Sequence, residues 1–262
     1  MKRTLTGAAA LALTVGVGAT AAGASTMVID DFSVNQFVQA ASQGNPASSQ
    51  VTGSMLGGTR FMQVFTSPGT QGGTSLNAEL GVLQFNNGSN DLGTGWVIYD
   101  GGDAGSREDV GIGANVHTKG LGGVNFLMGA PDSFFNFSGA AFNQGIGAAT
   151  AIFTAFAWDM DEGFSEYQEV IGGPDFTEKL FLSEFRDDWS DPLSVATVDW
   201  SNIGALAFTI SSQQTGDINF DGTIEAITLT PIPLPASALL LLGGMGGLAG
   251  LSAAAKRRRK AS

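Results

Sequence analysis

Residues Thr59-Arg60-Phe61-Met62-Gln63-Val64-Phe65-Thr66 alternate between two faces, as successive side chains do along a β-strand. Phe61 and Phe65 share one face, and Arg60 projects to the other. This alternation is typical of a sheet that buries one of its faces. The stretch therefore predicts a strand and indicates a β protein.

A second stretch, Ala151-Ile152-Phe153-Thr154-Ala155-Phe156-Ala157-Trp158, is apolar on both faces. We interpret it as a central strand; a buried helix is the alternative, because periodicity alone does not decide a short apolar run. Helical periodicity is nowhere sustained over three turns, and Gly, Asn, Asp and Ser interrupt the chain at short intervals. The other expected strands span 27–34, 50–55, 76–85, 96–100, 123–128, 134–137, 178–185, 196–199, 205–211 and 224–230. They predict an all-β fold, a jelly-roll-like β-sandwich, over residues 25–230.

The charge distribution excludes one class of partner. The chain has 24 acidic and 12 basic residues, and no cysteine. Seven of the bases lie at the two ends, so the central part carries five bases against 24 acids. Such a surface repels nucleic acid, which excludes DNA and RNA as partners. The lack of cysteine excludes disulfides, thiolate metal sites and cysteine nucleophiles.

The first 24 residues have the layout of a secretory signal peptide. Lys2 and Arg3 precede an apolar stretch, which ends in Ala22-Gly23-Ala24. Small residues at Ala22 and Ala24 suit signal peptidase, so we expect cleavage before Ser25. A membrane anchor is the alternative, but the apolar part is short and rich in Gly for a spanning helix.

The last 32 residues predict a membrane segment. Residues 236–255 carry no charge and are long enough to cross about 30 Å of hydrocarbon as a single transmembrane helix. A basic cluster follows at once, made of Lys256, Arg257, Arg258, Arg259 and Lys260. The positive-inside rule keeps that cluster in the cytoplasm and places the acidic domain on the other side.

The residues before this segment carry a resemblance. Pro233-Leu234-Pro235-Ala236, the Gly-rich span and the Arg-rich end resemble the PEP-CTERM class of bacterial sorting signals, in its VPLPA-type variant, with Ile232 where Val usually stands. The resemblance implies a Gram-negative-type envelope and recognition by an exosortase-type membrane protease. It also implies cleavage close to Pro233-Leu234-Pro235-Ala236, and release or transfer of the domain from the inner membrane to the cell surface or extracellular matrix.

A second resemblance concerns the domain between the signals. Ile29-Asp30-Asp31-Phe32, Leu56-Gly57-Gly58-Thr59-Arg60 and Phe220-Asp221-Gly222-Thr223-Ile224 look like segments of secreted jelly-roll ectodomains. They are also similar in outline to galactose-binding-like carbohydrate-binding modules. The resemblance implies a jelly roll and fixes no ligand-contacting residue.

Asp217-Ile218-Asn219-Phe220-Asp221-Gly222 fits the start of a calcium loop, with Glu225 at the ninth position. Thr228 stands at the twelfth position, where a bidentate Glu is expected, so an EF-hand does not fit. A calcium-stabilised β loop through Asp217, Asn219, Asp221 and Glu225 is one interpretation. An Asp-rich turn without a metal is the other, and no further cofactor is expected.

Catalytic signals are few. The only imidazole is His117, and neither a nucleophile elbow nor a metal-binding His pair is present. The acidic groups around Asp159 and Asp187 could chelate a cation, but we interpret them as solvated loops. No catalytic residue is predicted, and we expect a non-enzymatic protein.

Aromatic residues carry a binding hypothesis. The side chains able to stack on sugar faces are Trp96, Tyr99, Trp158, Tyr167, Trp189 and Trp200. Core packing is the alternative for each, and we favour it for Trp158 in its apolar run. Trp189 stands among Asp187, Asp188 and Asp191, which favours exposure. The first hypothesis is an exported surface or matrix protein; the second is a carbohydrate-binding module for exopolysaccharide, and the third is an enzyme acting on polysaccharide.

Overall fold

The computed structural model describes residues 25–40, 46–67, 73–88, 91–102, 108–109, 115–143, 150–173, 175–191, 193–213, 215–216 and 220–233. They lie in one compact unit, Ala24–Pro233. Within these ranges, no helix is long and apolar enough to cross a membrane. The expected signal peptide, the apolar segment 236–255 and the basic tail lie outside the described residues.

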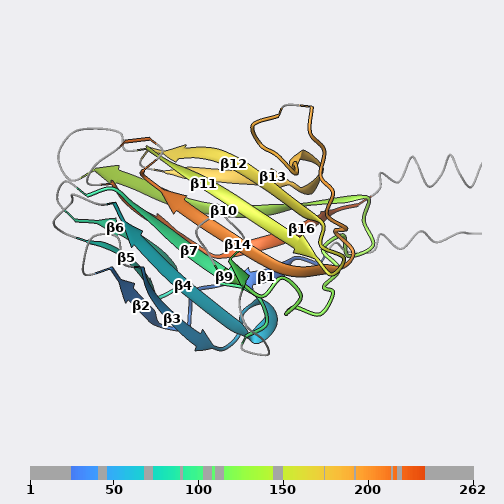
Figure 1. Cartoon of the computed structure of the whole chain (residues 1–262), viewed down its shortest axis with the longest axis horizontal. Helices are drawn as coiled ribbons and strands as arrows, with labels where there is room; N and C mark the ends of the chain where they lie inside the picture. Colours follow the sequence, from blue (N-terminus) through green and yellow to red (C-terminus); the bar gives the residue numbers. More distant parts are fainter. Residues whose placement is uncertain are drawn as a thin grey trace, which may run out of the picture. The chain divides into compact units, whose positions relative to one another are not determined.

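Two antiparallel sheets form the domain (Figure 1). The eight-stranded sheet contains β1 (Met27–Asp30), β2 (Gln36–Gln39), β5 (Thr74–Glu79), β6 (Val82–Asn87), β10 (Asp132–Asn143), β13 (Phe176–Phe181), β15 (Phe220–Ile224) and β16 (Ile227–Ile232). The six-stranded sheet has the order β12 (Phe164–Gly172), β11 (Thr150–Asp159), β14 (Ile203–Ser211), β7 (Gly93–Tyr99), β4 (Thr59–Thr66) and β3 (Ala47–Thr52). A short pair joins β8 (Glu108–Asp109) and β9 (Asn115–Val116). The all-β prediction is confirmed at the level of a β-sandwich.

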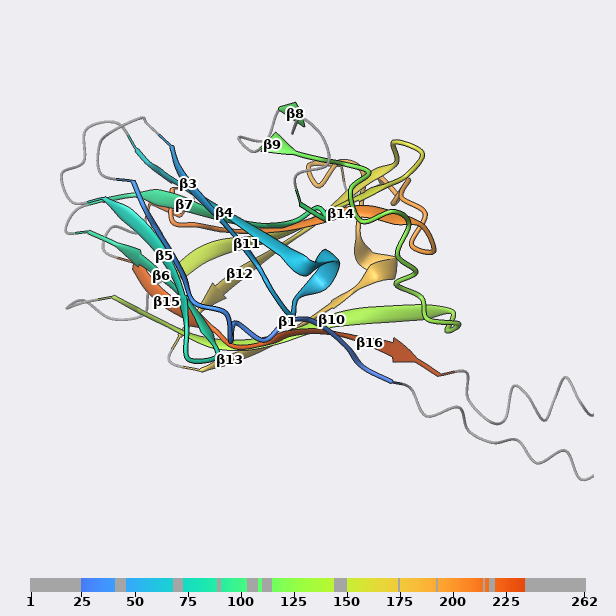
Figure 2. The ribbon, with the colours of Figure 1, turned by 90° about the horizontal axis from the view of Figure 1, so that it is seen from below.

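β10 organises the eight-stranded sheet. On one side it pairs with β13, from Phe134 opposite Phe181 to Gly139 opposite Phe176. On its other side β16 and β15 follow each other along the same strand. Figure 2 shows β10 and β16 in one layer and β4, β7 and β14 in the other. The large apolar side chains that face the gap between the two layers form the core.

Phenylalanine dominates that core. Phe137 of β10 and Phe153 of β11 stack with ring centroids 4.3 Å apart, which ties one sheet to the other. Phe208 of β14 lies 5.6 Å from Phe153 and 5.7 Å from Phe135. Offset and edge-on ring pairs of this kind stabilise a core beyond the area they bury.

The stretch 59–66 forms β4 as predicted, but its polar residue is the one that faces the core. Arg60 is fully buried between the sheets, with its guanidinium 5.5 Å from the ring of Phe32. Phe61 and Phe65 face outward and pack on a second apolar cluster, whose buried members are Trp96, Ile98, Val116, Phe156, Trp158, Ala205 and Ala207. The six-stranded sheet is therefore apolar on both faces.

Several expected strands differ in detail. The stretch 76–85 is a hairpin, because Leu80 and Gly81 both take a positive φ and reverse the chain between β5 and β6. The stretch 224–230 is split between β15 and β16, and β16 runs on through Pro231 to Ile232. Pro231 is tolerated there because β1 pairs with β16 only as far as Leu229, which leaves that edge open.

The acidic stretch after Asp159 differs most from its prediction as a solvated loop. It holds β12, which pairs with β11 from Phe164 to Gly172 and forms one edge of the six-stranded sheet. The run 151–158 is the neighbouring strand β11, paired on both sides, so the helix alternative is wrong. Residues 196–199 lie in a connecting segment and form no strand.

Candidate functional site

The candidate site lies where the chain crosses beside β12. After β13, a short 3₁₀ turn at Leu182–Glu184 leads into an irregular segment. The segment is fixed to β12 by two backbone hydrogen bonds: the N–H of Glu166 donates to the Arg186 carbonyl (2.6 Å), and the N–H of Arg186 donates to the Glu166 carbonyl (2.9 Å). This bridge brings side chains of β12 and of the irregular segment together.

Aromatic rings line the junction. Phe185 is buried and packs between Tyr167 of β12, at 5.6 Å between ring centroids, and Trp200, at 4.9 Å. Tyr167 in turn meets Trp189 at 4.9 Å, with the two rings tilted by 55°. Phe185 thus anchors Tyr167, and Tyr167 supports Trp189, which stays partly exposed. We call Tyr167 and Trp189 the aromatic wall.

The loop that carries Trp189 is held by its own polar groups. The Trp189 amide donates to the Glu166 carboxylate at 3.0 Å, and the Asp188 amide donates to the Ser194 hydroxyl at 3.0 Å. Asp188 and Asp191 accept from amides two residues further on, as Asp side chains do in tight turns. These carboxylates therefore shape the loop that positions the indole.

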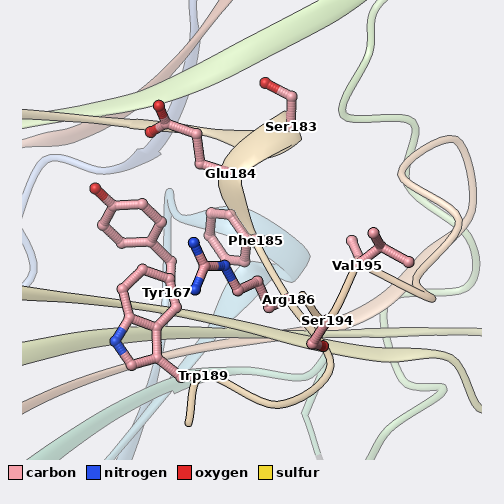
Figure 3. Close-up of a pocket in the computed structure, with 9 residues that line it drawn as sticks. Tyr167, Ser183, Glu184, Phe185, Arg186, Trp189, Ser194 and Val195 are labelled. Carbon is pink, nitrogen blue, oxygen red and sulfur yellow. The ribbon is translucent and has the colours of Figure 1, made fainter. Parts of the chain in front are cut away.

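Arg186 adds a cation to the wall. The central carbon of its guanidinium lies 4.8 Å from the ring centroid of Trp189, a cation–π distance. Figure 3 shows the guanidinium beside the indole. In the described part of the chain, no carboxylate forms an ion pair with Arg186.

These residues enclose a cavity of about 480 Å³. Its lining consists of Tyr167, Ser183, Glu184, Phe185, Arg186, Trp189, Ser194, Val195 and Ala196. Ligand pockets of proteins usually measure about 300–1,000 Å³ and combine apolar walls with a few polar groups. The cavity has that size, and its exposed lining is more polar than apolar.

The electrostatics of the cavity are acidic. Burial, and then the charges of Glu169, Glu184 and Glu178, raise the pKa of Tyr167 to about 12. The Tyr167 hydroxyl therefore stays protonated and donates to Glu169 at 3.2 Å. Burial also raises the pKa of Glu166, against the bond from the Trp189 amide, and nearby Asp188 raises it further.

The aromatic candidates divide into two groups. Trp96, Tyr99 and Trp158 are buried, and Trp158 packs on the outer cluster of the six-stranded sheet. Tyr167 and Trp189 come together at the cavity, although 22 positions separate them in the sequence. Trp200 supports the wall from behind through Phe185.

The structure describes only two of the four expected calcium ligands, Asp221 and Glu225. Asp217 and Asn219 lie outside the described residues. Asp221 is buried in β15. The Glu225 carboxylate accepts the Ser138 hydroxyl at 2.6 Å, and its amide donates to the Ser138 carbonyl at 2.8 Å. Among the described residues, no group of three or more His, Asp or Glu side chains is arranged to hold a metal, and the calcium site stays a prediction.

The other polar candidates have structural contacts. Asp159 is buried, and its carboxylate accepts amides of Asp161, Gly163 and Asp199, which closes the turn between β11 and β12. His117 has a buried Nδ1 without a hydrogen-bond partner, packed near the backbone of Gly120. Of the sorting motif, only Pro233 is described, and Leu234, Pro235 and Ala236 lie outside.

Sequence reasoning missed Arg186, Phe185 and Glu184 as parts of the site. One feature of the sequence could have indicated Arg186: it stands three positions before Trp189, in a segment with several Asp residues. Their common location depends on the bridge between Glu166 and Arg186, which no local pattern in the sequence shows.

No family model and no curated protein matches the chain. Solved structures with a similar chain trace include a family 11 carbohydrate-binding module of a cellulosomal cellulase of Clostridium thermocellum. Its sequence is 13% identical, the match covers 80% of this chain and 96% of that one, and the TM-score is 0.39. A family 30 carbohydrate-binding module of the same organism has 9% identity over 75% of this chain and 98% of that one, with a TM-score of 0.37. An agarase, AgWH50C, has 10% identity over 79% of this chain and 25% of the agarase chain, with a TM-score of 0.38. At these scores the likeness carries no argument about function, so a proposal has to rest on the cavity.

Proposed function

We propose that this domain is a non-catalytic carbohydrate-binding module, carried by an exported protein, that holds a polysaccharide chain against the aromatic wall. The observation that carries the proposal is the pair of partly exposed rings, Tyr167 and Trp189, 4.9 Å apart beside a cavity of about 480 Å³. The apolar face of a sugar ring packs on such a surface, while its hydroxyl groups meet polar groups at the rim.

The rim supplies those polar groups. The guanidinium of Arg186 presents several N–H donors in a fixed plane, which suits the neighbouring hydroxyls of a sugar. The backbone of Trp189 is anchored by the hydrogen bond from its amide to Glu166, and its indole ring contacts Arg186 through a cation–π interaction. A wall held in one geometry loses little entropy when a ligand binds.

Delivery to the cell surface is part of the proposal. The signal peptide and the sorting signal expected at the two ends support an extracellular location, where polysaccharide is the abundant ligand. Signal peptidase and an exosortase-type protease would then be processing partners, and the carbohydrate would be the partner of the mature domain.

A binding experiment tests the function. The full-length protein is titrated with a panel of bacterial and plant polysaccharides, and the supernatant is analysed for released sugars. We expect one class to bind with no product formed, and Trp189→Ala to weaken binding by about 30-fold or more, as truncation of a central aromatic contact does.

Two controls accompany this experiment. Trp189→Phe keeps a ring on the wall and should retain most of the affinity. Leu193→Ala changes an exposed side chain of the same loop and should leave affinity and melting temperature unchanged. Equal binding by wild type and Trp189→Ala would contradict the proposed site, and released oligosaccharides would favour an enzyme.

A further inference from the structure

The carboxylates around the cavity far outnumber its cations. Glu184 lines the cavity, Glu169 accepts from the Tyr167 hydroxyl, and Glu166 accepts from the Trp189 amide. The charge of Glu169 also acts on Glu178, and that of Asp188 on Glu166. Asp187 bonds to Ser194 of the lining. Glu184 is thus the acidic side chain of the lining, and five more carboxylates interact with the residues around it, whereas the lining contains one base, Arg186.

The basic residue nearest to Arg186 in the sequence, Lys179, contacts a ring outside the cavity lining. Lys179 of β13 lies with its ammonium 5.1 Å from the ring centroid of Phe134. Arg186 therefore stands in the lining without a second base, and its position is informative. It rests on the Trp189 ring and forms no ion pair with any described carboxylate. The aromatic wall and the surrounding negative charge already hold one positive group, the protein's own.

We propose that the ligand of this cavity is a glycan that carries free, protonated amino groups, such as a glucosamine polymer. This inference rests on the proposed function and specifies its substrate class. An ammonium group gains from the ring faces and from the carboxylates together. A polyuronate or a sulfated glycan would be repelled by the same carboxylates, and a neutral glycan would gain nothing from them.

Two oligosaccharides of equal length test the charge requirement. One is an oligomer of glucosamine with free amino groups, and the other is the same oligomer fully N-acetylated. Both are titrated into the full-length protein at about pH 6, where an amino group carries its proton and ordinary carboxylates are ionised. We expect the free-amine oligomer to bind about tenfold more tightly, and its advantage to shrink as salt screens the charges between about 0.02 M and 0.2 M.

Variants separate the contributions. Glu184→Gln removes one carboxylate of the lining and should lower the ratio of the two affinities by about threefold. Glu79→Gln is the matched control and should not change the ratio, since Glu79 lies on β5 and three strands separate β5 from β13 in the same sheet. Arg186→Gln removes the same donors and the same ring contact for both oligomers, so it should raise the ratio of the free-amine affinity to the acetylated affinity, because a like charge is lost only for the free-amine oligomer.

The outcomes are distinct. Equal or tighter binding of the acetylated oligomer, or a polyuronate that binds and is lost in Arg186→Gln, would overturn the amino-sugar inference and leave the carbohydrate function standing. Failure of every glycan in the panel to bind would overturn the proposed function itself, and the inference with it.

Discussion

Arg60 and Asp30 form an ion pair of 2.8 Å with both side chains withdrawn from water. Each partner is further satisfied: the Tyr99 hydroxyl donates to Asp30 at 2.9 Å, and Nε of Arg60 donates to Gln36 at 2.8 Å. The remaining guanidinium nitrogen donates to the Val34 carbonyl. A buried charge of this kind is tolerated because it is paired and each of the three guanidinium nitrogens has a hydrogen-bond acceptor.

Removal of one partner should therefore destabilise the domain strongly. We expect Asp30→Asn to lower the free energy of unfolding by about 3–5 kcal/mol, since it leaves the Arg60 charge uncompensated in the core. Chemical denaturation measures the loss. Asp31→Asn, at the exposed neighbouring position, is the control and should change little; equal stability of the two variants would contradict the role of the pair.

The contact between Phe137 and Phe153 predicts how the two sheets adhere. Phe153→Ala should cost about 3–5 kcal/mol, because it leaves a cavity between the layers. Phe37→Ala changes a ring that is 58% exposed on β2 and should cost far less. Thermal unfolding of both variants compares them directly. A similar loss in both would mean that the layers do not pack as described.

Glu166 predicts a pH-dependent change in stability. Its pKa is raised in the folded state, mainly by burial, so the folded protein binds that proton more tightly than the unfolded chain. The contribution of this group is present at low pH and is lost as the pH rises through its folded pKa. Glu166→Gln should thus raise the melting temperature at pH 7 by on the order of 1 °C and have no effect near about pH 4.

Asp188 supplies a control of opposite sign. Hydrogen bonds from Ser190 lower its pKa, so its stabilising contribution is present at neutral pH and is lost as the pH falls through the folded pKa. Asp188→Asn should lower the melting temperature at pH 7 and lose its effect in strong acid. The same direction of change in both variants would contradict these electrostatics.

Processing at the two ends predicts the mass of the mature protein. Protein from its native host should begin at Ser25 and should lack a peptide covering 239–257, as judged by intact-mass and peptide mass spectrometry. Recovery of that peptide in the mature form would identify the segment as a permanent anchor.

A chain cut after Pro233 should fold more stably than one cut after Thr230, because the shorter chain loses the pairing of Pro231 and Ile232 with β10.

The sequence predicts the fold class well, because alternation along a strand is a local property. It is readable in 59–66. In 151–158 the apolar residues on both faces favoured a central strand but left a buried helix as the alternative. The turn at Leu80 was missed because a Leu with φ of 55° is uncommon, and only Gly81 marked it. β12 was missed because its acidic residues resemble a loop, although an edge strand needs few apolar ones.

The site is less predictable than the fold. Trp189 stood out by its polar neighbours, and Tyr167 only as one of several aromatic residues. Their contact depends on the bridge between Glu166 and Arg186, residues that are 20 positions apart. Such long-range pairing is decided by the whole sandwich. The sequence also does not show which side of β4 faces the core. Arg60, a charged residue with hydrogen-bonded nitrogens, occupies a buried position where an apolar side chain is expected.

The first and last strands of the domain are neighbours, with Met27 opposite Leu229. The polypeptide therefore enters and leaves the sandwich at nearby backbone positions. β16 lies between β1 and β10 as far as Leu229, and it pairs with β10 alone from there to Ile232. Tension applied at the outgoing end would act along β16 and load its hydrogen bonds to β10 in shear, all of them together. A pull at that end would have to break the whole row of hydrogen bonds at once, which is a mechanically resistant attachment for the polysaccharide-binding module proposed above.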